Sequence, residues 1–90
     1  MANHASAKKR IRQTAKRTLR NKHIRTTVRT YVKRVRQAIE AGDAGAAREG
    51  LAVAVRGIDM AVSKGVYHRK TGSRYISRLS HQVAKLGANA

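Results

Sequence analysis

The sequence contains no cysteine, proline, tryptophan or phenylalanine, and three tyrosines are its whole aromatic content. Without cysteine the chain forms neither disulfides nor thiolate metal sites, which fits a reducing compartment. No apolar run approaches the roughly 20 residues needed to cross a bilayer, and the N-terminal stretch lacks the apolar segment of a signal peptide. We therefore expect a cytoplasmic protein with no membrane partner.

Acidic residues are also scarce: 4 Asp and Glu stand against 21 Lys and Arg, and the formal net charge is +17. Self-repulsion at that density opposes compaction, so the folded chain needs a polyanion nearby, and nucleic acid is the obvious candidate. A block of like charges is also typical of a solvated or disordered tail. Nucleic-acid binding and a disordered tail are compatible if the basic segment becomes ordered only when it binds RNA.

The basic stretch from Ser6 to Gly42 organises the chain. It has no proline and no internal glycine, which predicts one continuous helix of about 50 Å with Ser6 as N-cap and Gly42 as its stop. Apolar residues recur in its second half at three- and four-residue steps, which predicts packing into a bundle. These residues are Ile24, Val28, Tyr31, Val32, Val35, Ala38 and Ile39.

The first half of this helix carries only Ile11, Ala15 and Leu19, on nearly the opposite side. We expect residues 1–23 to project past a bundle of residues 24–86 into nucleic acid, while these three residues touch a second surface. The projecting segment and the bundle together form a single domain, residues 1–90. Four cations of the second half should lie opposite the apolar stripe: Arg25, Arg29, Lys33 and Arg36.

Two further helices follow. Asp43 is the expected N-cap of a helix from Ala44 to about Lys64 that Gly65 closes. Its apolar positions are Ala47, Leu51, Ala54, Val55, Ile58, Ala61 and Val62. The small side chains Gly50, Ala54, Gly57 and Ala61 share one flank, which either lets a neighbouring backbone approach closely or is a neutral feature of a solvated face.

The third helix lies within residues 66–86 and begins anywhere from Tyr67 to Ser73, because Gly72 weakens its first turn. Its apolar stripe is Tyr75, Ile76, Leu79, Val83 and Leu86. No strand pattern or repeat appears. Short glycine-containing turns predict an all-α fold, an elongated antiparallel three-helix bundle with an overhanging basic first helix.

Enzymatic signals are absent from the sequence. The four histidines share no i,i+4 spacing with each other or with a carboxylate, and no glycine-rich phosphate loop follows a strand. We therefore expect no catalytic residue, metal, cofactor or small-molecule substrate. His68, beside Arg69 and Lys70, is either a phosphate or base contact or an ordinary surface histidine.

Several segments resemble one known family. They are MAN with SAKKRIRQ at the start, LRNK at 19–22, IEAGD at 39–43 and IDMAVSKGVYHRKTGSRYISRL at 58–79. Together they are similar to the S20 family of bacterial small-subunit ribosomal proteins. The resemblance implies a three-helix bundle that binds 16S ribosomal RNA directly and assists subunit assembly. It places these matching positions at or near RNA: Lys8, Lys9, Arg10, Arg12, Arg20, Asn21, Lys22, Ser63, Lys64, Gly65, His68, Arg74, Ser77 and Arg78.

The charge of the remaining basic residues adds Lys16, Arg17, Arg25, Arg29, Arg69 and Lys70 to the expected RNA contacts. Where the family often continues with Lys and Ala after the histidine, this chain has Thr71, Gly72, Ser73, Tyr75 and Ile76, which indicates a stronger hydrophobic seam. Tyr31 and Tyr75 lie on apolar stripes and are expected in the core. Tyr67 is free to be either a core residue or a stacking platform.

Phosphate neutralisation should supply most of the affinity, and the shape of folded RNA should supply the specificity. The expected role is a structural clamp that acts as a monomer within the small ribosomal subunit. The main rival is a histone-like DNA compactor. A membrane-active cationic helix needs a wider apolar face than Ile11, Ala15 and Leu19 provide, and an enzyme is the weakest alternative.

Overall fold

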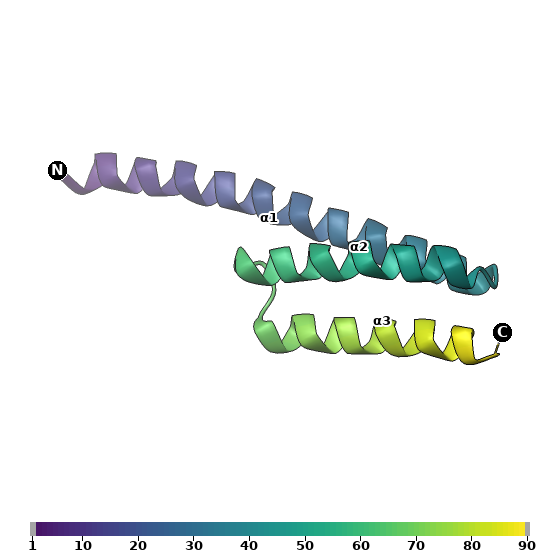
Figure 1. Cartoon of the computed structure of the whole chain (residues 1–90). Coiled ribbons are helices and arrows are strands. Elements are labelled where there is room, and N and C mark those ends of the chain that lie inside the picture. Colours follow the sequence, from purple (N-terminus) through teal and green to yellow (C-terminus); the bar gives the residue numbers. More distant parts are fainter. Residues whose placement is uncertain (1, 90) are drawn as a thin grey trace.

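The computed structural model describes the backbone of residues 2–89 and the side chains of residues 4–87. Three helices make up this part of the chain: α1 (Ala2–Glu40), α2 (Ala44–Ser63) and α3 (Arg69–Asn89). They run up, down and up, with α1 extending well beyond the other two (Figure 1). The predicted all-α, elongated architecture is confirmed. No described helix is long and apolar enough to span a membrane.

The start of α1 differs from the sequence prediction. Ser6 does not cap the helix, because α1 already includes Ala2 and runs through Ser6 without a break. Ala5 and Ala7 flank this serine, and alanine has the highest intrinsic helix propensity, so the helix extends further toward the N-terminus. At the other end of the chain, α3 continues to Asn89, beyond the expected limit at residue 86.

Both helix-ending glycines adopt the left-handed backbone conformation that the sequence predicted. Gly42 has a φ of 73° and Gly65 a φ of 77°. After each glycine the next amide closes a long turn: Asp43 N–H donates to the Ala38 carbonyl at 2.9 Å, and Val66 N–H donates to the Ala61 carbonyl at 2.9 Å. These are Schellman endings, in which glycine avoids the steric cost that a Cβ atom would bring.

Asp43 also begins α2, as predicted. Its side-chain oxygen accepts a hydrogen bond from the Ala46 N–H at 3.0 Å, and its own carbonyl accepts from Ala47 N–H at 3.0 Å. One residue therefore completes the α1 ending and caps the following helix. The turn is short because both jobs fall on the same position.

The three helices form a row with α2 in the middle (Figure 1). The radius of gyration is 17.8 Å and the extents are 68 × 21 × 14 Å. A compact chain of this length would have a radius of gyration of about 12 Å. The excess arises from the length of α1 and from the flat arrangement, in which α1 and α3 each pack mainly on α2.

The core is thin and consists of small side chains. Its buried members come from all three helices, and the two largest with no exposed surface are Val35 of α1 and Ile58 of α2. The other buried apolar residues are Val28, Ala47, Ala54, Ala61, Val66, Leu79 and Val83. The apolar stripes predicted for α1 and α2 therefore do face the core.

The small-residue flank of α2 faces α1 and permits close approach, which favours the packing interpretation over the neutral one. A Cβ atom on Gly57 would lie 2.9 Å from Cδ2 of Tyr31, and one on Gly50 would lie 3.1 Å from Cγ2 of Val35. Ala54 is fully buried on the same flank. The Tyr31 ring therefore occupies space that any larger residue at position 57 would need.

Candidate nucleic-acid interface

The N-terminal part of α1 has no cover from the rest of the chain. Every side chain from residue 4 to residue 20 is exposed, and Asn21 is the first that is half-buried. We call residues 4–20 the overhang. Seven of the predicted RNA contacts lie on it, namely Lys8, Lys9, Arg10, Arg12, Lys16, Arg17 and Arg20.

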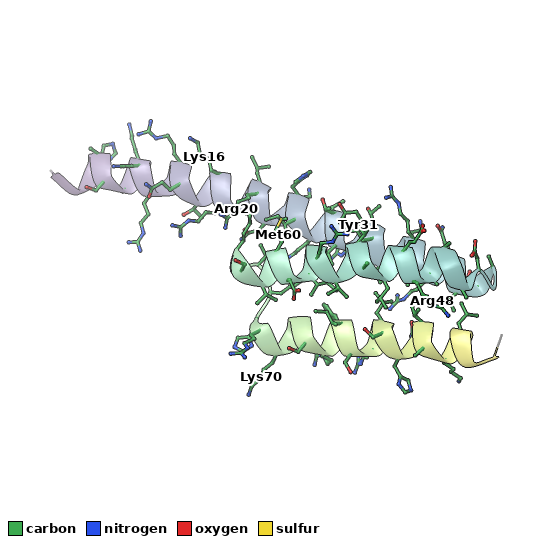
Figure 2. The ribbon with its side chains drawn as sticks, in the orientation of Figure 1. Lys16, Arg20, Tyr31, Arg48, Met60 and Lys70 are labelled. Atoms are coloured by element: carbon green, nitrogen blue, oxygen red, sulfur yellow. The ribbon has the colours of Figure 1, made fainter. Side chains whose placement is uncertain are left out.

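Arg20 connects the overhang to the adjacent end of the bundle, where α2 ends. Its guanidinium Nη2 donates to the Lys64 carbonyl oxygen at 3.3 Å and approaches Asn21 Oδ1 at 3.4 Å. Lys64 is the C-cap of α2, where unsatisfied carbonyl groups carry partial negative charge. The cation is therefore held at the favourable end of the α2 dipole, and Figure 2 shows Arg20 directed toward that end of α2.

Because Arg20 reaches the C-terminal end of α2, its side of the overhang is the side nearest to the end of the bundle. Lys9, Lys16 and Arg17 precede Arg20 by eleven, four and three residues, which places them near it around the helix, although the Lys16 side chain extends on the side of α1 away from α2 (Figure 2). The α2–α3 turn, which lies at the end of the bundle from which the overhang projects (Figure 1), contributes a second cationic wall. Its exposed side chains are Lys64, His68, Arg69 and Lys70. We call the cationic residues of the overhang face and of this turn, taken together, the notch; Lys70 points away from α1 (Figure 2).

His68 has a defined role in the second wall. Its Nδ1 accepts a hydrogen bond from Lys70 N–H at 3.1 Å, and its carbonyl accepts from Gly72 N–H at 3.0 Å. The imidazole therefore caps α3 in the way that Asp or Ser usually does. Since Nδ1 accepts, a neutral ring carries its proton on Nε2, which is left to donate outward.

The beginning of α3 is poor in negative charge. Its first turn contains no acidic residue and opens with Arg69 and Lys70, although a helix N-terminus carries partial positive charge. Cations at that end are unfavourable until an anion neutralises them. The arrangement at His68, Arg69 and Lys70 thus favours a phosphate over any neutral neighbour.

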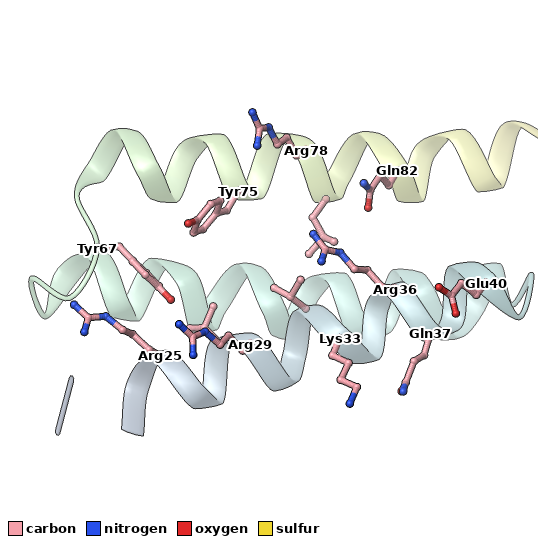
Figure 3. Close-up of a pocket in the computed structure, with 13 residues that line it drawn as sticks. Arg25, Arg29, Lys33, Arg36, Gln37, Glu40, Tyr67, Tyr75, Arg78 and Gln82 are labelled. Carbon is pink, nitrogen blue, oxygen red and sulfur yellow. The ribbon is translucent and has the colours of Figure 1, made fainter. Parts of the chain in front are cut away.

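Four cations of α1 do not lie where the sequence placed them. Arg25, Arg29, Lys33 and Arg36 were expected opposite the apolar stripe, but they line a groove of about 960 Å³ between α1 and α3. Helical spacing puts Arg25, Arg29 and Arg36 on the flank of the stripe, and the flat row of helices turns that flank toward α3, whereas the Lys33 side chain points away from α3 (Figure 3). Arg78 also contributes to the groove from α3, and its guanidinium lies on the side of α3 away from α1 (Figure 3).

The expectation that Tyr75 belongs to the core is wrong. Its side chain keeps 39% of its surface exposed and lines the α1–α3 groove with Tyr67. The two rings meet edge to face, with centroids 5.7 Å apart and an angle of 83° between their planes. The Arg74 guanidinium lies over the Tyr75 ring, 5.8 Å from its centroid. Tyr31, in contrast, is half-buried between α1 and α2.

The remaining predicted positions are dispersed over the surface. Lys22 and Arg74 are exposed outside the notch, and so are the matching positions Ser63, Gly65 and Ser77. The apolar row of the overhang is uncovered as well, since Ile11 and Leu19 expose 69% and 70% of their surface. That this row touches a second surface stays a prediction.

No group of three or more His, Cys, Asp or Glu side chains among the described residues is arranged to hold a metal ion. What the described surface does concentrate is positive charge, in the notch and in the groove. Sequence reasoning found the notch residues from their charge, but it did not find Lys33, Arg36, Tyr67 and Tyr75 as neighbours in one groove. The steps of three and four residues between the α1 cations were the available signal.

Comparison with known proteins identifies the family of this chain. A profile of the family described as ribosomal protein S20 matches residues 2–84. The chain belongs to the ribosomal protein S20 family. A relative from Geotalea uraniireducens named small ribosomal subunit protein bS20 is 59% identical over 87 residues, which cover 97% of this chain and 100% of the relative. The protein of the same name from Geobacter sulfurreducens is 55% identical over 87 residues, with the same coverage.

Membership of the S20 family confirms the resemblance seen in the sequence. A match over residues 2–84 includes the overhang, the notch and the whole groove, so the family comparison covers every surface described above. It does not say which side chains meet RNA. The individual contacts therefore stay predictions that follow from the charge and geometry of this chain.

Proposed function

We propose that the protein is a structural component of the small ribosomal subunit that binds 16S ribosomal RNA directly and stabilises its fold during assembly. It acts in the cytoplasm as one copy per particle, without catalysis. Family membership supports a place in the small ribosomal subunit, and the cationic notch supports RNA as the binding partner. The single observation that carries the proposal is the Arg20 to Lys64 hydrogen bond, because it brings two cationic walls from distant parts of the sequence to one corner.

The notch favours RNA through electrostatics. Each phosphate that Lys or Arg neutralises releases condensed counterions, which supplies sequence-independent affinity that falls as salt rises. A net charge of +17 also steers the chain toward any polyanion. Binding reduces the self-repulsion of the overhang, so the free energy of folding and that of RNA binding are linked.

Specificity comes from the shape of the notch. The major groove of an A-form helix is too deep and narrow for side chains to read, so double-stranded RNA is recognised by its backbone geometry. The two walls meet at Arg20, so they can contact phosphates on two RNA segments at once only if the angle between those RNA segments matches the angle between the walls. The notch therefore recognises folded RNA and clamps the junction between its segments, with residues 1–90 acting as one unit.

The experiment compares wild-type protein with a variant in which Lys9, Lys16 and Arg17 are replaced by Gln. All three are exposed, so the variant should keep the bundle intact while removing one wall of the notch. We expect its affinity for 16S ribosomal RNA, and its incorporation into reconstituted small subunits, to fall at least tenfold. The matched control replaces Arg48, Arg56 and Lys85, which removes the same charge from exposed sites outside the notch.

Equal losses in the two triple variants would mean that net charge alone determines binding, and the notch would then have no special role. Duplex DNA of random sequence at the same salt tests the main rival. Wild-type protein that binds this DNA as tightly as the ribosomal RNA would favour a DNA compactor over the proposed function. A clear preference for the folded RNA supports the clamp.

A further inference from the structure

The groove between α1 and α3 is a second surface, separate from the notch. Its floor is apolar: Val28 and Leu79 are buried and Val32 is half-buried. Its walls carry five cations, while Glu40 is the one carboxylate among the described residues that line it. Figure 3 shows Glu40 near the end far from Tyr67, so the positive charge surrounds the aromatic end.

We infer that this groove holds a single-stranded segment of ribosomal RNA, with an unpaired base stacked on the exposed Tyr75 ring and its phosphates beside Arg25, Arg29 and Arg36. The inference rests on the proposed function and deepens it. It adds a binding site for unpaired nucleotides to the proposed binding of the phosphate backbone of folded RNA at the notch. Three features of the groove support it: its size, the spacing of its cations and its pair of tyrosines.

The size of the groove selects single strands. A volume of about 960 Å³ is at the upper end of the range of about 300–1,000 Å³ that is typical of sites for small ligands. A groove of that volume takes a few nucleotides and cannot enclose a double helix. A duplex would rest on the outer rims of the two walls, away from the apolar floor and from Tyr75.

The spacing of the cations fits a repeating anion. Arg25, Arg29, Lys33 and Arg36 follow one another by four, four and three residues, so about one helical turn of 5–6 Å separates each from the next. A nucleic acid strand presents its phosphates at a regular repeat of the same order. Arg78 of α3 can bind a phosphate through two parallel N–H groups.

The aromatic pair distinguishes RNA from an acidic peptide. The face of a tyrosine ring carries negative electrostatic potential, so a carboxylate avoids it, whereas the face of any base stacks on it. Tyr67 meets Tyr75 edge to face, the Arg74 guanidinium lies over the Tyr75 ring at 5.8 Å from its centroid, and Tyr75 as a residue remains 39% exposed. A groove built for a peptide carboxylate would gain nothing from this arrangement.

The chain has no tryptophan, so its intrinsic fluorescence reports on its three tyrosines alone. The full-length protein is titrated with a single-stranded oligoadenylate, and separately with a fully paired RNA duplex of equal phosphate number at the same salt. We expect the single strand to quench tyrosine fluorescence and the duplex to leave it nearly unchanged. Equal quenching by both RNAs would overturn the inference.

Two substitutions at one position isolate stacking. Tyr75→Leu keeps an apolar side chain on α3 but removes the ring, and we expect it to weaken oligoadenylate binding about tenfold, as for the loss of one stacked base. Tyr75→Phe keeps the ring and should bind like wild type. Circular dichroism checks that both variants remain folded. Wild-type affinity in Tyr75→Leu would show that no base stacks there.

Ultraviolet cross-linking of the wild-type chain to the same oligoadenylate requires no variant. The tyrosines fall in separate tryptic peptides, residues 30–33, 65–69 and 75–78. Cross-links should appear in residues 75–78, with a lower yield in 65–69. Cross-links confined to residues 30–33 would place the base elsewhere and overturn the inference.

A double variant, Arg29→Gln with Arg36→Gln, tests the groove cations. A second double variant, Arg34→Gln with Arg48→Gln, removes the same charge from exposed residues outside the groove. The first should lose several-fold more oligoadenylate affinity than the second, and equal losses would overturn the inference. A polyglutamate peptide that displaces the oligoadenylate at equal charge would likewise overturn it, in favour of an acidic partner.

The notch variant separates this inference from the proposed function. Replacement of Lys9, Lys16 and Arg17 should weaken binding of 16S ribosomal RNA and leave quenching by oligoadenylate at more than half the wild-type value. If the groove variants bind oligoadenylate normally while the notch variant still loses ribosomal RNA, the groove site is wrong and the proposed function stands. If the notch variant binds ribosomal RNA normally, the proposed function is what fails.

Discussion

Gly72 of α3 lies directly against Val62 of α2. A Cβ atom at position 72 would be 2.5 Å from Val62 Cγ2 and 3.4 Å from Cγ2 of Ile58, so the glycine is buried at the closest approach of the two helices. The backbone N–H of Gly72 donates the first backbone hydrogen bond of α3, to the His68 carbonyl at 3.0 Å. Gly72 has a low helix propensity and so weakens the first turn of α3, but the close packing of α3 against Val62 requires a residue without a Cβ atom at this position.

Gly72→Ala should destabilise the protein. Overpacking of this kind costs about 1–3 kcal/mol, and the better helix propensity of alanine returns up to about 1 kcal/mol, so a net loss of about 1 kcal/mol is expected. The melting temperature should fall by about 4–8 °C. Gly45→Ala is the control, because a Cβ there meets only Asp43 Oδ1 at 3.7 Å. A higher melting temperature for both variants would contradict the packing argument.

Substitutions of His68 should separate its two roles. His68→Asn offers a side-chain oxygen to the Lys70 N–H, so helix capping and thermal stability should stay near wild type while the outward Nε2 donor is lost. His68→Ala should lose both, with a stability cost of about 1 kcal/mol. Thermal melts and 16S ribosomal RNA titrations measure the two effects. If the His68→Asn variant binds RNA as tightly as wild type, the imidazole does not belong to the interface.

Salt dependence should reveal how many phosphates the notch contacts. The logarithm of the binding constant for ribosomal RNA should fall linearly with the logarithm of salt concentration. Replacing Lys9, Lys16 and Arg17 by Gln removes three such contacts and should reduce the magnitude of that slope by about 2. The control variant at Arg48, Arg56 and Lys85 should change the slope by much less. An unchanged slope in the notch variant would mean that these side chains meet no phosphate.

The overhang should gain protection when RNA binds. Residues 4–20 make no core contact and carry cations at three- and four-residue spacings, which repel one another along the helix. Their backbone amides should therefore exchange rapidly in the free protein and slowly in the complex with 16S ribosomal RNA. Deletion of residues 1–23 should abolish the gain in helicity that accompanies binding. Strong protection of these amides without RNA would show that the helix needs no polyanion.

Local signals predicted most of the fold. Gly42, Asp43 and Gly65 act through their own backbone conformations and immediate hydrogen bonds, and the apolar steps of α1 and α2 depend only on the helical repeat. The start of α1 was predicted wrongly because Ser6 resembles a cap only where the preceding residues disfavour helix, and alanine-rich residues 2–7 favour it.

The distribution of charge and of helices was thus determined by the sequence alone. Tertiary structure decided how the helices are arranged around one another. α2 occupies the middle of the row, so the flank that carries Arg29 turns toward α3, and Tyr75 remains exposed instead of entering the core. The hydrogen bond from Arg20 to Lys64 likewise joins positions far apart in the chain. A helical repeat fixes the angle between side chains on one helix, but only packing between helices fixes what each face meets.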